Sequence, residues 1–303
     1  MRYLTFIAPG EQRTRLGALI AEDRVVSLAR GDLPTDMLSF IQAGADIWET
    51  AEAVARSTQS VWPLDQVTVK APLQNPPTLR DFYAFETHVK TANRNRGREV
   101  PEEWYEFPVF YFTNPHTIQG PGEDVTLPAY TQALDYELEV AAMIGKPGRD
   151  ITADKAMEHI FGFTIMNDWS ARDVQRKEMK VGLGPAKGKD FATSLGPWIV
   201  TPDELARRAA KRPGVYHAAM VARVNGEERS RGDWNDIYYS FGELIARASE
   251  GVTLLAGDVI GSGTVGTGCL LEITKGEGPW LKRGDVVELE VEGIGTLINR
   301  VGN

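Results

Sequence analysis

The chain has 303 residues, of which 42% are hydrophobic, and 42 acidic against 33 basic side chains give it a formal net charge of -9. This negative charge disfavours nucleic acid or an anionic membrane as the main partner. No stretch approaches the ~20 apolar residues that a membrane-spanning helix needs. The apolar run at the N-terminus is too short for a signal peptide, and the single cysteine, Cys269, excludes a disulfide framework within the chain. We therefore expect a globular protein of the cytoplasm.

The first 70 residues or so predict a small α+β unit. A strand, a β-hairpin and two helices are predicted in this order, over residues 2–7, 15–28, 35–44 and 45–55. A segment punctuated by prolines follows, from Trp62 to Pro77, and it indicates a crossing between two units. We place the boundary near residue 70, which gives domains 1–70 and 71–303.

The segment from Asp81 to Pro101 is basic in an otherwise acidic protein. It contains one lysine and three arginines, at Lys90, Arg94, Arg96 and Arg98. A solvated helix face is the commoner origin of such a run. The alternative is a mobile lid, over about residues 85–105, that brings cations to an anionic substrate.

Three carboxylates follow in apolar surroundings. Glu137 and Glu139 stand two apart in a run that predicts a strand, so their side chains leave it on the same face. Asp168 ends a second apolar run and can meet them there. Three such carboxylates repel one another unless a cation neutralises them, and hard oxygen ligands favour Mg²⁺, Mn²⁺ or Ca²⁺ over Zn²⁺. The plainer interpretation is a polar strand face on a half-exposed sheet.

Strands dominate the chain beyond the boundary. They are predicted over residues 108–113, 135–144, 161–167, 197–201, 217–225, 257–262, 268–274 and 285–292. Two capping boxes predict helices that begin after Thr201 and after Ser240, the second of them ending at Gly251. The expected fold class is α+β and mostly β, with helices packed outside.

Three further segments, together with the carboxylates, resemble motifs of the fumarylacetoacetate hydrolase superfamily. The resemblance covers most of residues 70–300. Residues 166–175, Met-Asn-Asp-Trp-Ser-Ala-Arg-Asp-Val-Gln, are similar to its most distinctive segment. Residues 188–198 resemble its lysine segment, and residues 261–264 resemble its substrate-binding turn. The resemblance implies a mixed β-sandwich roll or barrel as the C-terminal domain, preceded by a small N-terminal α+β domain.

The resemblance also implies roles for single residues. The metal ligands would be Glu137, Glu139, Asp168 and Asp81. The catalytic residues would be His88, oriented by Glu272, and Lys189. Substrate would be bound by Tyr83, Gln175, Thr264, Arg96 and Arg98. Taken singly, His88 would be a surface-helix histidine and Lys189 a strand-edge lysine, so the interpretation depends on the whole set.

The implied activity is metal-dependent hydrolysis of a carbon–carbon bond in a 2,4-dioxo acid, such as fumarylacetoacetate or an acylpyruvate. Mg²⁺ is the expected ion, with Mn²⁺ or Ca²⁺ as alternatives, and His88 would activate water. The alternatives on the same site are oxaloacetate decarboxylation and isomerisation of 2-hydroxyhepta-2,4-diene-1,7-dioate. A non-catalytic protein that kept the fold is the alternative from another class. The chain departs from fumarylacetoacetases at Met179, where they have a tyrosine. A homodimer is expected.

Overall fold

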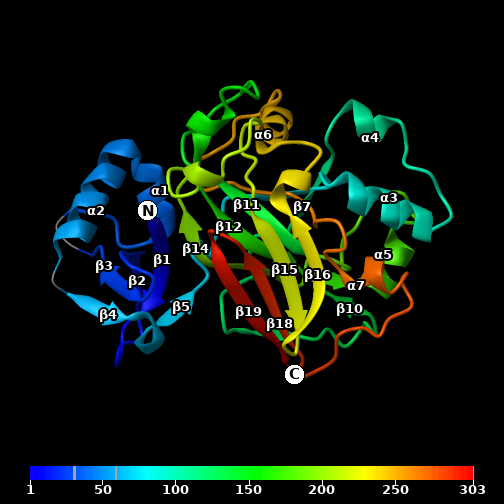
Figure 1. Ribbon diagram of the computed structural model, residues 1–303, viewed down its shortest axis with the longest axis horizontal. Coiled ribbons are helices and arrows are strands. Elements are labelled where there is room, and N and C mark those ends of the chain that lie inside the picture. The colour runs from blue at the N-terminus through cyan, green and yellow to red at the C-terminus, as the bar shows by residue number, and fades with distance from the viewer. Residues whose placement is uncertain (30–31, 59, 303) are drawn as a thin grey trace.

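The structure is a computed structural model that describes residues 1–29, 32–58 and 60–302 (Figure 1). A large sheet of 12 strands runs through its centre. The strands on its main path are, in spatial order, β4 (Val61–Pro63), β3 (Arg24–Ser27), β2 (Thr14–Leu19), β1 (Arg2–Ile7), β14 (Thr193–Val200), β12 (Ile160–Asp168), β11 (Leu138–Ile144), β17 (Val259–Gly261), β6 (Leu79–Phe82) and β7 (Phe110–Thr113). Beside this path, β5 (Thr68–Lys70) pairs with β1, and β8 (Ile118–Gln119) pairs with β14.

Two smaller sheets complete the β-structure. The larger of them has five strands, in the order β16 (Glu227–Asp233), β15 (Ala219–Val224), β18 (Val286–Val291), β19 (Gly295–Gly302) and β9 (Asp124–Thr126). The other pairs β10 (Leu134–Asp135) with β13 (Ser170–Ala171).

Helices surround these sheets. The α-helices are α1 (Met37–Ala43), α2 (Ala45–Ser57), α3 (Glu86–Asn95), α4 (Glu103–Glu106), α5 (Arg172–Glu178), α6 (Phe241–Ser249) and α7 (Leu270–Ile273). The 3₁₀-helices are η1 (Leu64–Gln66), η2 (Ala156–His159), η3 (Ala206–Arg208) and η4 (Trp234–Asp236). Within the described residues, no helix combines the length and the apolar character that crossing a membrane requires.

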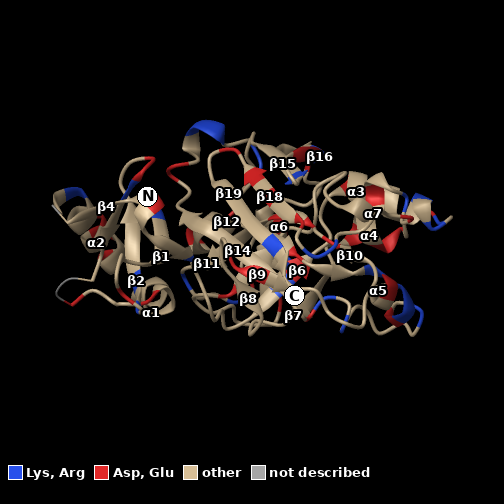
Figure 2. Ribbon diagram, turned by 90° about the horizontal axis from the view of Figure 1, so that it is seen from below, with Lys and Arg blue, Asp and Glu red and all other residues tan. Residues whose placement is uncertain are grey.

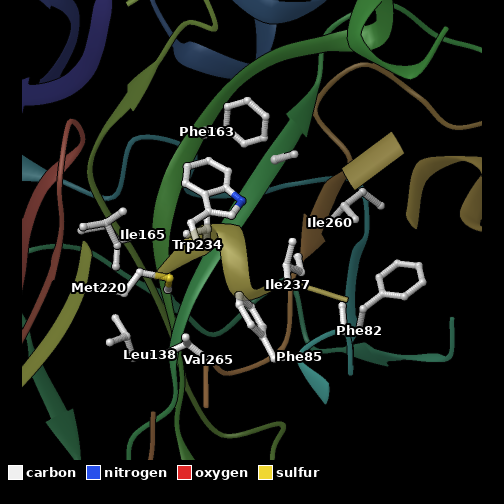
Figure 3. Packing of buried hydrophobic residues seen from close by; sticks show 14 of the residues in the cluster. Phe82, Phe85, Leu138, Phe163, Ile165, Met220, Trp234, Ile237, Ile260 and Val265 are labelled. Atoms are coloured by element: carbon white, nitrogen blue, oxygen red, sulfur yellow. The ribbon is translucent and has the colours of Figure 1, made fainter. Parts of the chain in front are cut away.

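The two central strands are buried on both faces. Every residue of β11 and β12 is buried, because their apolar sequences are covered by a different hydrophobic core on each side. The larger core lies between these strands and the five-stranded sheet (Figure 3). At its centre, the ring centroids of Trp234 and Phe163 lie 5.0 Å apart with the rings nearly perpendicular, an edge-to-face arrangement that aromatic pairs prefer.

The second core joins the N-terminal unit to the rest of the molecule. The ring centroid of Tyr3 lies 5.0 Å from that of Phe40 in α1 and 5.6 Å from that of Phe161 in β12. A β-bulge makes this contact possible: Met143 pairs with Gly162 and Ile144 with Ile160, so Phe161 has no partner on β11. Because a bulge shifts the alternation of side chains, Phe161 belongs to the second core while Phe163 belongs to the first.

The predicted fold class is confirmed: the chain is α+β and rich in strands, with the N-terminal unit beside the main body in Figure 1. The large sheet is open, with β4 and β7 at its edges, so it does not close into a barrel. It also crosses the predicted domain boundary, since Arg2 in β1 pairs with Val200 in β14. The division at residue 70 stays a prediction.

Two predicted elements are wrong. Residues 268–274 do not form a strand, because α7 begins at Leu270, where the carboxylate of Asp135 accepts its first backbone N–H groups. No α-helix follows Thr201, because its hydroxyl donates to the carbonyl of Met1 and the next residues form i→i+3 turns that end in η3. The box at Ser240 is confirmed and begins α6.

Candidate metal centre and active site

The ladder between β11 and β12 brings two of the predicted carboxylates together. Leu138 pairs with Asn167, so the next residues outward, Glu137 and Asp168, lie side by side. Glu139 lies inside β11, but Glu137 lies just before the strand begins. The prediction that one strand contains both residues is therefore wrong. The physical reason is that the Asn167 Oδ1 atom accepts the backbone N–H of Glu137 at 2.9 Å in place of a ladder partner.

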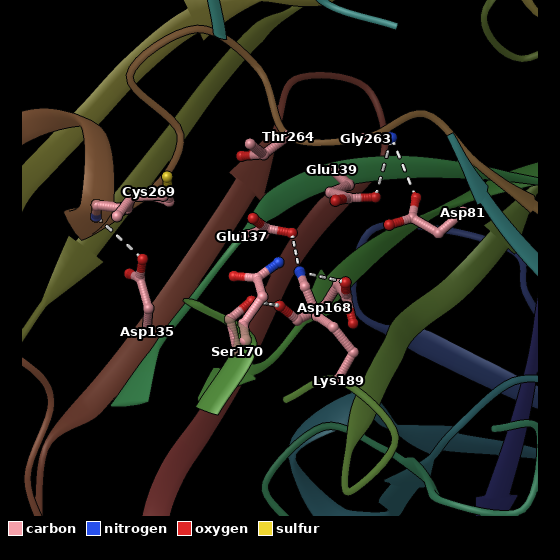
Figure 4. Close-up of polar contacts among 12 residues, drawn as sticks. Asp81, Asp135, Glu137, Glu139, Asp168, Ser170, Lys189, Gly263, Thr264 and Cys269 are labelled. Carbon is pink, nitrogen blue, oxygen red and sulfur yellow. Dashed lines mark hydrogen bonds and ion pairs between the residues drawn. The ribbon is translucent and has the colours of Figure 1, made fainter. Parts of the chain in front are cut away.

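Two glycines make room for the fourth carboxylate. Asp81 in β6 pairs with Gly261 in the parallel strand β17. A Cβ atom at Gly261 would lie 2.5 Å from Asp81 Oδ1, so any side chain there would displace the carboxylate. The backbone N–H of Gly263 donates to Asp81 and to Glu139, each at 3.2 Å (Figure 4). One ligand atom from each of four residues therefore lies within 4.8 Å of the others, from Asp81, Glu137, Glu139 and Asp168.

Two buried cations lie against one side of this cluster. The Lys189 ammonium contacts Glu137 and lies 2.6 Å from Asp168 (Figure 4), and Arg172 Nη2 lies 2.8 Å from Glu137. Burial opposes ionisation of Glu137, but the charges of Lys189 and Arg172 outweigh it and lower its pKa to about 2. Burial lowers the pKa of Lys189, but the charges of Asp168 and Glu137 outweigh this effect and raise it above its usual value.

The other side of the cluster lacks counter-charge. Burial, together with the charge of Asp168, raises the pKa of Asp81 to about 8, and burial together with Asp81 raises the pKa of Glu139 well above its usual value. Within the described residues, Glu139 Oε1 and Asp168 Oδ1 are buried without a hydrogen-bond partner. Unpartnered oxygens in a buried carboxylate cluster fit a hard divalent cation such as Mg²⁺, Mn²⁺ or Ca²⁺.

A histidine–glutamate pair lies beside the cluster. His88, in the first turn of α3, has its Nδ1 atom 2.7 Å from Glu272 Oε2 in α7, and both side chains are buried. The backbone N–H of Thr267 donates to the other carboxylate oxygen of Glu272 at 3.2 Å. A carboxylate that accepts Nδ1–H fixes the tautomer of the ring and leaves Nε2 free to exchange protons.

One cavity of about 320 Å³ connects these groups. Its polar side contains Asp81, Glu137, Lys189 and His88, and its apolar side is lined by Phe82, Ala92, Val109, Phe110, Met179, Leu183, Pro185 and Leu271. Of the substrate-binding residues implied by the sequence, Tyr83, Gln175, Thr264 and Arg96 line the cavity. Arg98 does not line it and is exposed, because the chain turns away after the end of α3.

Sequence reasoning missed two residues of the site. Tyr111, opposite Asp81 in the β6–β7 ladder, donates its hydroxyl to Asp168 and lies 3.1 Å from Asp81. The sequence signal for Tyr111 is a tyrosine between two phenylalanines in a predicted strand. Its hydroxyl would leave the strand on the face opposite to Phe110 and Phe112. Arg172 was part of the segment that carried the resemblance, but its contacts join residues far apart in the sequence.

Comparisons with known proteins agree with this geometry. The family model described as fumarylacetoacetate (FAA) hydrolase C-terminal matches residues 78–302. The chain is 33% identical over 308 residues to a mitochondrial oxaloacetate tautomerase of Homo sapiens, covering 99% of this chain and 91% of the relative. Among solved structures, a fumarylacetoacetate hydrolase from Exiguobacterium antarcticum aligns with a TM-score of 0.77 at 29% identity, covering 100% of this chain and 99% of the other. A probable 2-hydroxyhepta-2,4-diene-1,7-dioate isomerase from Mycobacterium abscessus aligns with a TM-score of 0.75 at 27% identity, covering 100% and 98%.

Proposed function

The chain belongs to the fumarylacetoacetate hydrolase family, and from this premise we propose that it is a metal-dependent oxaloacetate tautomerase. The observation that carries the proposal is that His88, which is paired with Glu272, lines the same cavity as Lys189, Asp81 and Glu137. A tautomerase needs one group that both accepts and returns a proton, beside positive charge that stabilises an enolate. The name of the human relative supports the same substrate. Carbon–carbon hydrolysis, which the sequence favoured, becomes the second candidate.

The carboxylate cluster would hold the ion. A divalent cation bound by Glu137, Glu139, Asp168 and Asp81 supplies the positive charge that favours the enolate form of a 2-oxo acid. Lys189 adds a second charge at this end of the cavity. Arg96 forms no ion pair within the described residues, so its guanidinium is free for the distal carboxylate of oxaloacetate.

His88 would move the proton. In the keto form, the C–H bond next to the ketone breaks, its electron pair forms the double bond of the enolate, and the proton moves to His88 Nε2. The same proton then passes from His88 to the enolate oxygen and gives the enol, so no group is consumed, and the reverse steps convert enol to keto. The carboxylate of Glu272, 2.7 Å from His88 Nδ1, stabilises the imidazolium between the two transfers.

The test is conversion of enol-oxaloacetate to the keto form, followed by ultraviolet absorbance with Mg²⁺ and with EDTA. We expect His88→Ala to lower kcat by about 10²–10⁴-fold and to leave Mg²⁺ affinity nearly intact. Glu137→Ala should remove both activity and binding. His116→Ala is the matched control, because His116 is exposed and lies outside the cavity. A wild-type rate equal to the spontaneous rate would refute the proposal.

Hydrolysis of an acylpyruvate is the second candidate, and the apolar side of the cavity favours it. Val109, Phe110 and Leu183 offer room for an acyl group that oxaloacetate lacks. In this reaction His88 would take the proton from water instead of from carbon. Cleavage of acetylpyruvate, assayed with and without EDTA, separates hydrolase from tautomerase. Release of pyruvate from oxaloacetate that survives His88→Ala would indicate decarboxylation, which needs no water activation.

A further inference from the structure

We infer that Asp135 and Arg172 are positioning residues that hold the metal-binding Glu137 and the His88–Glu272 pair in a fixed relation. The inference rests on the proposed role of His88 as the proton acceptor. Asp135 does not line the cavity, and Arg172, which does, acts here through the side chains that it holds.

Arg172 joins three side chains with one rigid group. Its side chain is 3% exposed, and its Nε atom donates to Asp135 Oδ2 at 2.7 Å. The same guanidinium donates through Nη2 to Glu137 Oε1 at 2.8 Å and through Nη1 to Gln175 Oε1 at 3.0 Å. Because a guanidinium is planar, these partners cannot move independently of one another.

Asp135 carries this connection to α7. Its carboxylate, which is 0% exposed, accepts the backbone N–H of Leu270 at 2.8 Å and that of Leu271 at 3.0 Å. These N–H groups begin the helix and have no partner inside it. Cys269, the N-cap residue of α7, makes no capping hydrogen bond with its side chain. The start of α7 is therefore fixed by a carboxylate from a distant part of the chain.

The helix in turn carries Glu272. With only four residues, α7 is too short to be stable without external contacts. A shift of its first turn would move the carboxylate of Glu272, which lies 2.7 Å from His88 Nδ1. A continuous path of contacts thus runs from Glu137 through Arg172, Asp135 and α7 to the proton-transferring histidine.

The test is Asp135→Asn, which keeps the shape of the side chain but removes its charge. We expect kcat to fall by about 10–100-fold, as is usual when a supporting partner is lost, with KM nearly unchanged. Mg²⁺ affinity, measured by titration calorimetry, should change less than kcat. The ring ¹⁵N signals of His88, assigned with His88→Ala, should shift because the carboxylate of Glu272, 2.7 Å from Nδ1, is displaced.

Asp173→Asn is the matched control. Asp173 follows Arg172 in α5 and, like Asp135, accepts a backbone N–H, that of Gln132 at 3.0 Å. It has no hydrogen bond to α7 within the described residues. Its variant should keep the wild-type kcat and His88 signals. Unchanged His88 signals in Asp135→Asn would overturn the inference, and so would an equal loss in both variants.

Two further measures keep the test decisive. If Asp135→Asn does not fold, Arg172→Lys keeps the positive charge but cannot reach both carboxylates, and it should shift the His88 signals and weaken Mg²⁺ binding together. Wild-type signals in a folded Arg172→Lys protein would refute the inference. The ¹⁵N signals need no turnover, so a wild-type protein inactive on oxaloacetate would contradict the proposed function and leave the positioning inference to be judged by the signals alone.

Discussion

At the residue scale, the four carboxylates of the cluster differ in the counter-charge they receive. Glu137 contacts both Lys189 and Arg172, whereas Glu139, among the described residues, receives only the backbone N–H of Gly263. The difference appears in their pKa values, which are lowered for Glu137 and raised for Glu139. A divalent ion would therefore relieve most repulsion on the side of Glu139 and Asp81.

We expect Glu139→Ala to weaken Mg²⁺ binding by at least about 10–100-fold, because it removes a buried ligand oxygen that has no hydrogen-bond partner in the described part of the chain. Titration calorimetry measures the change directly. Glu158→Ala is the control, since Glu158 lies in η2 on the surface. Unchanged affinity with full activity in the Glu139 variant would contradict the assignment.

Without the family resemblance, the sequence predicts residues of the site only where local geometry decides the direction of their side chains. Glu137 and Glu139 converge because extended chain repeats every two residues, and this holds although Glu137 lies outside β11. Arg98 does not line the cavity, and the sequence could not show this. Helix α3 ends at Asn95, and no local rule gives the direction of the chain beyond it. Tyr111 needed the pairing of β6 with β7, a contact between distant segments.

At the scale of elements, the predicted lid is only partly loose. His88, Val89 and Ala92 bury one face of α3, and Trp104 in α4 is 4% exposed. Between the two helices lie residues 96–102, and all of them except Val100 are exposed. The elements that position the site are therefore fixed, while the link that carries Arg96 is not held by packing.

Hydrogen exchange should separate these parts. We expect fast exchange over residues 96–102 and slow exchange in the buried part of α3, because only the latter has packed side chains and helical hydrogen bonds. Adding Mg²⁺ and oxalate should slow exchange in the link by engaging Arg96. Uniform protection before and after addition would count against a lid.

A second prediction concerns the turn between β8 and β9. Glu123 Oε2 accepts the backbone N–H of Gly120 at 2.7 Å, and Oε1 lies 2.8 Å from Lys70 Nζ in β5. Burial opposes ionisation, but these contacts lower the pKa of Glu123 below its usual value. Its stabilisation is therefore present above the unfolded pKa of about 4.3 and is lost as the pH falls through the lower folded value.

Glu123→Gln should lower both Tm and the free energy of unfolding at pH 7. The loss of free energy should be less than about 1 kcal/mol, because the pair is partly exposed. The difference from wild type should shrink as the pH approaches about 3. Calorimetry at several pH values measures this, with Glu277→Gln, an exposed glutamate, as the control. A difference that stays constant with pH would show that Glu123 acts through packing alone.

Element types were predictable where hydrogen bonds are local. The capping box at Ser240 is self-contained, and α6 forms as predicted. The apolar run at α7 suits a strand or a helix equally, and the carboxylate of Asp135 decides between them from far away in the sequence.

At the scale of the whole molecule, charges of both signs are interspersed over the elements visible in Figure 2. The apolar surface is more concentrated. Phe112 and Val109, at the edge strand β7, are 61% and 39% exposed, and Leu183, in the loop after α5, is 92% exposed. Trp234 is fully buried in the larger core and adds nothing to this surface.

We expect a homodimer that covers apolar surface at the β7 edge and buries more than ~1,000 Å² in total. Sedimentation velocity at micromolar concentration should show about twice the mass of one chain. Phe112→Glu should shift the protein toward monomers while Mg²⁺ binding persists, because Phe112 does not line the cavity. A wild-type monomer under these conditions would refute the prediction.

The pairing of β1 with β14 has a consequence for the order of events during synthesis. Strand β14 is made about 190 residues after β1, so the first strand of the chain must wait for its neighbour in the central sheet. At a translation rate of ~5–20 residues per second, the wait is roughly ten to forty seconds. During this time β1 can pair with β2 on one edge and, over residues 5–7, with β5 on the other, but Arg2 and Tyr3, which will meet β14, remain open to other chains. A nascent chain of this protein therefore depends on its C-terminal half to complete the sheet that its N-terminal half begins.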